Sequence, residues 1–156
     1  MLDEMGINYF SVDHQAVYTI EEMEKCNLPY MEYVAKNLFL RDDKKQHYYL
    51  VVMTHEKSAD LKKLKDIIGS RKLSFASETD LTMKLDLIKG SVTPFGILND
   101  EERSVEVIID NDIMNKEKVG VHPNTNEASL WLSPIDVVKI VEDHGNSVKF
   151  VDIPNI

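Results

Sequence analysis

Hydrophobic and polar positions change over in short blocks along the chain, a pattern typical of a domain that mixes strands with helices. Several blocks are rich in aromatic and β-branched residues and are bounded by polar or turn-forming residues, as strands are. Two of them flank a polar turn at 41–46 and predict a hairpin. We expect strands at 7–13, 35–40, 48–53, 72–75, 105–110, 119–122, 129–132 and 148–151.

Helices are predicted where a capping residue precedes apolar positions three and four apart. A capping box formed by Thr19 and Glu22 predicts one short helix. A second is expected from the cap Asp60, through the apolar positions Leu61, Leu64, Ile67 and Ile68, to Gly69.

Two more helix starts are predicted further along the chain. Ser77 with Asp80 at its third position predicts one helix. Ser133 followed by Pro134 predicts another, with Ile135, Val138 and Val141 on one stripe and an end before Gly145. Residues 86–100, around Pro94 and Gly96, are expected to form a loop.

The length of 156 residues indicates one compact domain, 1–156, of the α/β (α+β) class. A chain of this size buries roughly 70% of its unfolded surface and needs no disulfide to hold a core. It has one cysteine, Cys26, which is either inert or a nucleophile. Its acidic N-terminus and the lack of a long apolar run predict a cytoplasmic protein without membrane contact.

The net charge of −9 argues against broad, nonspecific binding to nucleic acid but leaves room for a small site at one RNA end. Charge is uneven: residues 57–72 hold six basic and two acidic side chains, whereas 99–112 hold six acidic and one basic. These stretches are either two solvated surfaces, or a basic face toward RNA and an acidic face away from it.

No zinc-type histidine spacing, calcium loop, dinucleotide motif, P-loop or nucleophile elbow is present, so we expect no metal and no cofactor. Three features remain as candidate chemistry. Lys36 stands in an apolar strand, where an ammonium either reaches the surface or holds an anion. The loop Gly90–Gly96 could present backbone N–H groups to an oxygen, and the polar loop His122–Asn126 carries hydrogen-bonding side chains.

These segments, in this order and spacing, resemble the YbaK/prolyl-tRNA-synthetase-associated domain family, most closely its free-standing prolyl-tRNA editing members. The resemblance covers about 7–150. It is carried by the segments 36–40, 48–52, 61–64 and 73–77, by the GxxxP loop Gly90–Pro94 extended to Gly96, and by 122–126 and 128–133.

The resemblance implies a mixed, largely antiparallel sheet that curls around a pocket, with flanking helices. It also implies hydrolysis of mischarged aminoacyl-tRNA, with the alanyl-tRNA(Pro) branch matching best because an Asn follows the functional lysine. The expected partner is the acceptor end of tRNA(Pro), with prolyl-tRNA synthetase as an open further partner. Lys36 is the expected catalytic residue, and the expected substrate-binding residues are Asn37, Gly90, Ser91, Val92, Thr93, Pro94, Phe95, Gly96, His122 and Asn124.

The mechanism we expect has no protein nucleophile. Lys36 anchors a phosphate or the ribose, N–H groups of the 90–96 loop stabilise the oxyanion, and water attacks, assisted by the substrate's ribose hydroxyl. A synthetase pocket that fits proline cannot exclude the smaller alanine, since a missing methylene is worth only about 1–3 kcal/mol of discrimination. A second, smaller pocket that admits alanine and excludes proline solves this problem. Three alternatives stay open: a cysteinyl-tRNA(Pro) deacylase, a non-catalytic binding module, and an interaction partner of a synthetase.

Overall fold

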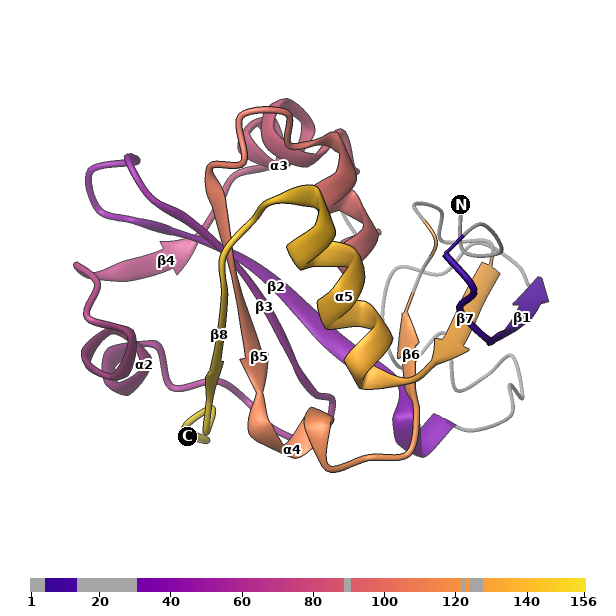
Figure 1. Ribbon diagram of the computed structural model, residues 1–156. Helices are drawn as coiled ribbons and strands as arrows, with labels where there is room; N and C mark the ends of the chain where they lie inside the picture. Colours follow the sequence, from indigo (N-terminus) through magenta and orange to yellow (C-terminus); the bar gives the residue numbers. More distant parts are fainter. Residues whose placement is uncertain (1–4, 14–30, 89–90, 122, 124–127) are drawn as a thin grey trace.

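The computed structural model describes residues 5–13, 31–88, 91–121, 123 and 128–156 (Figure 1). Short strands alternate with helices, which confirms the α/β class. In chain order the elements are β1 (Tyr9–Asp13), η1 (Met31–Tyr33), β2 (Ala35–Asp42), β3 (Tyr48–Thr54), α2 (Leu61–Ile68), β4 (Leu73–Phe75), α3 (Glu78–Leu85), η2 (Pro94–Asn99), β5 (Val105–Asp110), α4 (Asn111–Met114), β6 (Val119–Val121), β7 (Ala128–Leu132), α5 (Pro134–His144) and β8 (Val148–Val151).

Within the described residues, the strands form a five-stranded sheet in the order β4-β2-β3-β5-β8 and a three-stranded sheet in the order β1-β7-β6. The hairpin β2–β3 pairs antiparallel, and β4 joins β2 antiparallel. β5 and β8 add in parallel on the other side, while the small sheet is antiparallel throughout. Mixed and mainly antiparallel pairing is therefore confirmed over the two sheets together, although the larger sheet by itself is half parallel. Within the described residues the strands do not close into a barrel.

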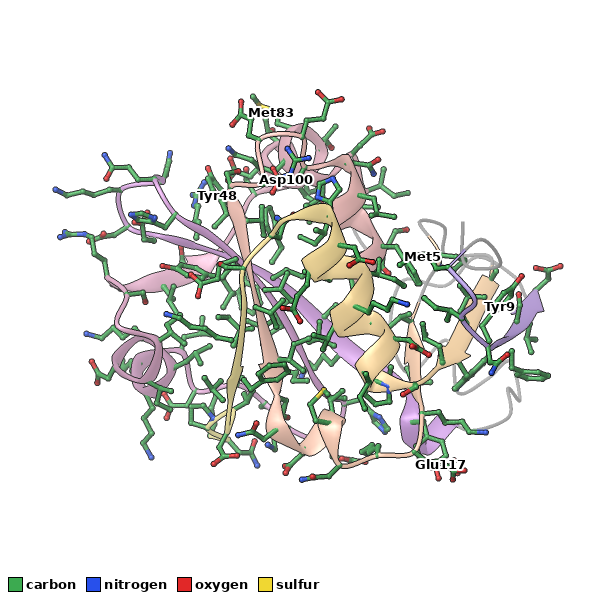
Figure 2. The ribbon with its side chains drawn as sticks, viewed as in Figure 1. Met5, Tyr9, Tyr48, Met83, Asp100 and Glu117 are labelled. Atoms are coloured by element: carbon green, nitrogen blue, oxygen red, sulfur yellow. The ribbon has the colours of Figure 1, made fainter. Side chains whose placement is uncertain are left out.

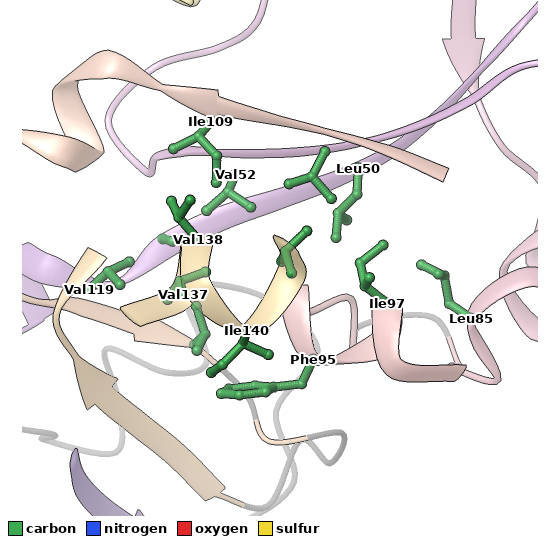
Figure 3. Packing of buried hydrophobic residues seen from close by; sticks show 14 of the residues in the cluster. Leu50, Val52, Leu85, Phe95, Ile97, Ile109, Val119, Val137, Val138 and Ile140 are labelled. Atoms are coloured by element: carbon green, nitrogen blue, oxygen red, sulfur yellow. The ribbon is translucent and has the colours of Figure 1, made fainter. Parts of the chain in front are cut away.

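The larger sheet is buried on both faces, since alternate side chains of a strand point to opposite sides. One face packs against η2, α3 and α5, and Figure 3 shows Phe95 and Ile97 of η2 beside Ile140 of α5. The other face packs against α2 through the fully buried Leu64. β3 is therefore buried throughout, as expected of a strand covered on both sides.

The helix ends follow the predicted signals. Asp60 caps α2 by accepting from the Lys63 N–H, and Gly69 ends it in the left-handed conformation at φ 70°. At α3, Ser77 and Asp80 form both hydrogen bonds of a capping box. α3 supplies Glu78 and Leu81 to the wall of the cavity described below.

Three local expectations were wrong. Residues 94–99 form the 3-10 helix η2 rather than a loop, because Thr93 caps it by accepting from the Phe95 N–H. Ile67 and Ile135 are exposed, whereas Val138 and Val141 are buried as predicted. The buried side of α5 also includes Pro134, Val137 and Ile140. Ser133 stands at the N-cap of α5 but makes no side-chain capping bond.

Some expectations need only new bounds or lie outside the described residues. β2 continues two residues beyond the predicted 35–40, to Asp42. β6 ends at Val121, and the predicted Thr19–Glu22 capping box with its helix falls outside the described residues. The acidic stretch 99–112 is not a uniform surface, because Asp100 and Asp110 are buried.

Candidate functional site

A cavity of 440 Å³ opens at the edge of the larger sheet. It exists because the three-residue strand β4 pairs only with the last part of β2, Leu40–Asp42. Among the described residues, the earlier part of β2 has no strand partner on that side. After β4 the chain turns away into α3, so the cavity lies between β2, the start of α3 and the segment after residue 90. Its lining residues are Asn37, Leu38, Phe39, Phe75, Ala76, Ser77, Glu78, Leu81 and Val92.

The cavity spans both faces of the sheet edge. Asn37 shares one face of β2 with Ala35 and Phe39, which belong to the core beneath α5. Leu38 lies on the other face with Leu40, toward α2. A ligand bound here would therefore touch an amide on one side of the strand and apolar carbons on the other.

Asn37 places a buried polar atom without a hydrogen-bond partner among the described residues in the cavity wall. This atom is the side-chain oxygen Oδ1. A buried acceptor left unpaired costs about 1–3 kcal/mol, so this atom is expected to meet a donor from a ligand. The sequence predicted Asn37 as a substrate contact, and the structure brings it to the cavity wall.

The predicted loop residues 91–96 lie on the Asn37 side, with Val92 in the cavity wall. Most of the N–H groups in this segment are engaged. The Ser91 N–H donates to Ile88, the Phe95 N–H to the Thr93 hydroxyl, and the Gly96 N–H to the Thr93 carbonyl. The Val92 N–H donates to none of the described residues and is the donor that this segment leaves open.

Gly96 is required for a reason other than the one the sequence predicted. Its φ angle is not positive, unlike those of Gly69 and Gly145. A Cβ at this position would instead come within 2.5 Å of the Leu87 side chain. Close packing, rather than backbone freedom, therefore fixes glycine at the first turn of η2.

Lys36 does not line the cavity. It lies on the face of β2 that carries Leu38 and Leu40, whereas Val92 packs on the opposite face. Its ammonium donates to the carbonyl oxygen of Lys57 at 2.9 Å. Within the described part of the chain it forms no ion pair with a carboxylate, so this half-buried charge remains open to an anion.

Lys57, which holds Lys36 through its backbone, is itself held by charge. Its ammonium lies 3.1 Å from Oδ2 of the fully buried Asp110 and 2.8 Å from Asp112. Burial opposes its charge, but the hydrogen bonds to Asp112 and Asp110 outweigh burial and raise the pKa of Lys57. The sequence missed this lysine because its partners stand more than 50 residues away along the chain.

A second ionic cluster lies beside the cavity at the start of α3. Asp80 pairs with Arg41 of β2 and accepts from the Tyr48 hydroxyl at 3.2 Å. Burial opposes ionisation of Asp80, but hydrogen bonds from Ser77, Arg41 and Tyr48 outweigh it and lower its pKa. Burial, followed by the charge of Asp80, raises the pKa of Tyr48.

Some predicted residues cannot be placed, and some cavity residues were missed. Gly90, His122 and Asn124 lie outside the described residues, as does Cys26. Phe75, Glu78 and Leu81 line the cavity, but the sequence predicted none of them as a site residue, although Phe75 lies in the resembling segment 73–77. Only the capping box at 77–80 hinted that the chain turns at this point.

The described residues contain no group of three or more His, Cys, Asp or Glu side chains arranged to hold a metal ion. Among the same residues, no helix has the length and apolar character needed to cross a membrane.

The sequence profile of the aminoacyl-tRNA editing domain matches residues 14–140. The match spans most of the chain, including β2, the cavity and the segment after residue 90. The chain therefore belongs to the aminoacyl-tRNA editing domain family, a class of aminoacyl-tRNA deacylases, as the resemblance implied.

Individual relatives narrow the branch. The chain is 51% identical over 152 residues to the prolyl-tRNA editing protein ProX of Acetoanaerobium sticklandii, covering 97% of this chain and 93% of that one. It is 36% identical to the prolyl-tRNA synthetase associated domain-containing protein 1 of Mus musculus, covering 93% and 88%. The fold matches the crystal structure of a candidate trans-editing enzyme for prolyl-tRNA synthetase, with a TM-score of 0.76, 18% identity and coverage of 99% and 92%.

Proposed function

We propose that the protein, acting as one editing domain over residues 1–156, hydrolyses the ester of alanyl-tRNA(Pro) and releases alanine and tRNA(Pro). The observation that carries this proposal is the cavity at the free edge of β2, with the unpaired Asn37 oxygen in its wall. The high identity to a prolyl-tRNA editing protein supports the choice of tRNA.

The cavity suits the free amino group of an aminoacyl ester. An α-ammonium donates hydrogen bonds and carries positive charge, and the Asn37 oxygen and the Glu78 carboxylate both line the cavity as acceptors. In this pose the amino acid side chain lies against Phe39, Leu81 and Val92. We propose that this apolar wall accepts a methyl group and excludes a pyrrolidine ring, which is the selectivity that a second sieve must supply.

Hydrolysis then needs a donor for the oxygen on which negative charge develops. We assign this role to the Val92 N–H, since the N–H groups of Ser91, Phe95 and Gly96 donate within the protein. The oxygen of a water molecule bonds to the ester carbon, the bond from that carbon to the ribose oxygen breaks, and a water proton passes to that oxygen. Ser91, Thr93, Pro94, Phe95 and Gly96 hold this wall in shape, and Gly90 is proposed to precede it in the site.

Lys36 supplies the positive charge in this proposal. It lies on the same face of β2 as Leu38, which lines the other side of the cavity, so a substrate crossing the strand edge would bring its ribose or terminal phosphate toward that face. The ammonium would then leave the Lys57 carbonyl for a phosphate oxygen. His122 and Asn124 are proposed to contact the terminal adenosine or the aminoacyl group.

The experiment that tests the proposal compares deacylation of alanyl-tRNA(Pro), cysteinyl-tRNA(Pro) and prolyl-tRNA(Pro) by the purified protein. We expect rapid release of alanine and little release of proline. Faster release of cysteine than of alanine would make cysteinyl-tRNA(Pro) the substrate. Release of every amino acid no faster than in buffer alone would indicate a non-catalytic binding module. We place the reaction in the cytoplasm, where tRNA is charged, and a pull-down with prolyl-tRNA synthetase tests whether that enzyme is a partner.

A further inference from the structure

Phe75 is an aromatic side chain that the fold leaves in water at the cavity. It is 62% exposed although it is the last residue of a strand and stands opposite the fully buried Leu40. Single exposed apolar residues are common and need no special reason. Phe75 differs because its ring is part of the cavity wall.

Phe75 lies on the outer side of the cavity. Its pairing with Leu40 places it on the face of β2 that also carries Leu38 and Lys36. Asn37 and Val92 lie on the other side of the strand edge. If the aminoacyl ester binds against Asn37 and Val92, the next part of the substrate, the 3′-terminal nucleoside, extends toward Leu38 and Phe75.

We propose that Phe75 is the stacking platform for the 3′-terminal base of the tRNA, an inference that rests on the proposed function. A base offers a flat π-face, and stacking on an exposed aromatic ring is a common way for proteins to hold single-stranded ends. Leu38 continues the apolar surface inward. Phe75 is thus a positioning residue that fixes the nucleoside while the ester is held elsewhere.

The charges around β4 fit the same occupant. Five exposed lysines in the β2–β3 hairpin, in α2 and just before β4 form no ion pair with the described residues: Lys44, Lys45, Lys62, Lys63 and Lys72. The hairpin, β4 and α2 lie together at the left of Figure 1, and nitrogen-tipped side chains reach into solvent there in Figure 2. We call these five residues the lysine surface, and it continues from Phe75 in the direction that the phosphates would take.

The test measures steady-state deacylation of alanyl-tRNA(Pro) by Phe75→Ala, Phe75→Leu and Phe75→Trp. Stacking on one base corresponds to roughly a 5- to 150-fold change in affinity. We expect Phe75→Ala to raise KM by about tenfold or more with kcat within a few fold of wild type. Phe75→Trp should keep KM near the wild-type value. Phe75→Leu should raise KM, because leucine keeps apolar area without a π-face.

Phe150→Ala is the matched control, since Phe150 is 47% exposed on β8, the opposite edge of the same sheet. A second readout uses tRNA(Pro) ending in 2-aminopurine, whose fluorescence should fall on binding wild type but not Phe75→Ala. The stacking role is overturned if Phe75→Ala leaves KM unchanged, or if Phe75→Trp raises KM as much as Phe75→Ala does. A wild-type protein that fails to release alanine overturns the proposed function instead, and the fluorescence readout still reports on stacking.

Discussion

The ammonium of Lys57 lies 3.1 Å from Oδ2 of Asp110, a carboxylate with no exposed surface, and the backbone carbonyl of the same lysine holds Lys36. Asp110 also accepts from the backbone N–H groups of Thr54 and Asp112. One buried carboxylate therefore ties the end of β3, the start of α4 and the loop that carries Lys57 together. The position of the candidate catalytic lysine depends on this tie.

Asp110→Ala should be strongly destabilising, because it leaves the Lys57 ammonium partly buried without its inner partner. Removing one member of a buried ion pair costs about 3–5 kcal/mol. Urea unfolding followed by circular dichroism measures the loss. Asp112→Ala is the matched comparison: Asp112 contacts the same ammonium but is 55% exposed, so about 1 kcal/mol or less is expected. Equal losses in the two variants would contradict the assignment.

Lys36→Ala should reduce kcat/KM for alanyl-tRNA(Pro) without unfolding the protein. A charge-assisted hydrogen bond to a phosphate is worth about 1.5–3 kcal/mol, which corresponds to about a tenfold or larger loss. Lys36→Arg should keep part of the activity, since the charge remains. Lys139→Ala, an exposed lysine on α5, serves as the control for removal of a positive charge. Full activity of Lys36→Ala would remove this residue from the mechanism.

Val92 should set the size of the amino acid that is accepted, because its side chain lies in the cavity wall. Val92→Ala enlarges the cavity and should let the enzyme hydrolyse prolyl-tRNA(Pro), whereas Val92→Leu should slow release of alanine. Differences of one or two carbon atoms change selectivity by about tenfold or more. The ratio of the alanine and proline rates measures the effect, and a ratio that neither variant moves would place the amino acid elsewhere.

Much of this architecture could be predicted from local sequence. The alternating strands, the caps Asp60 and Ser77 and the terminator Gly69 depend on near neighbours, and the structure confirms them. The resemblance implied a pocket, but its position at the sheet edge could not be predicted, because it results from how short β4 is relative to β2. Lys57 gave no signal for a similar reason: only the folded chain brings Asp110 beside it.

Some of the predicted site residues line the cavity and others do not, for physical reasons. Asn37 and Val92 were chosen together and do meet at the cavity, whereas Lys36 was expected beside the same loop and lies on the other face of its strand. A single-residue step along a strand reverses the face, so adjacent residues cannot serve the same side. The resemblance offered these residues as candidates, and strand geometry decides which part of a substrate each could reach.

Asp80 should make the stability of the protein depend on pH in the acidic range. Its pKa is lowered in the folded state, so its contribution is fully present above its unfolded pKa of about 3.9 and is lost as pH falls through the folded value. Asp80→Asn should cost about 1 kcal/mol at pH 7, through loss of the charged cap and the Arg41 pair. The gap between variant and wild type should shrink as pH falls below about 4 in urea titrations. Asp66→Asn, exposed on α2, should show no such convergence.

The lysine surface should determine the salt dependence of tRNA binding. Each phosphate contact contributes about 0.7–0.9 to the slope of log K against log salt concentration, through released counterions. Replacing Lys62, Lys63 and Lys72 by Gln should therefore weaken binding of tRNA(Pro) and reduce that slope by about 2. Fluorescence anisotropy at several salt concentrations measures both quantities. The net charge of −9 makes this a strict test, because the rest of the protein repels RNA. Lys139→Gln removes the same unit of charge from α5 and should leave the slope unchanged. If it lowers the slope as much as each replaced surface lysine does, general electrostatics explains binding and the lysine surface does not.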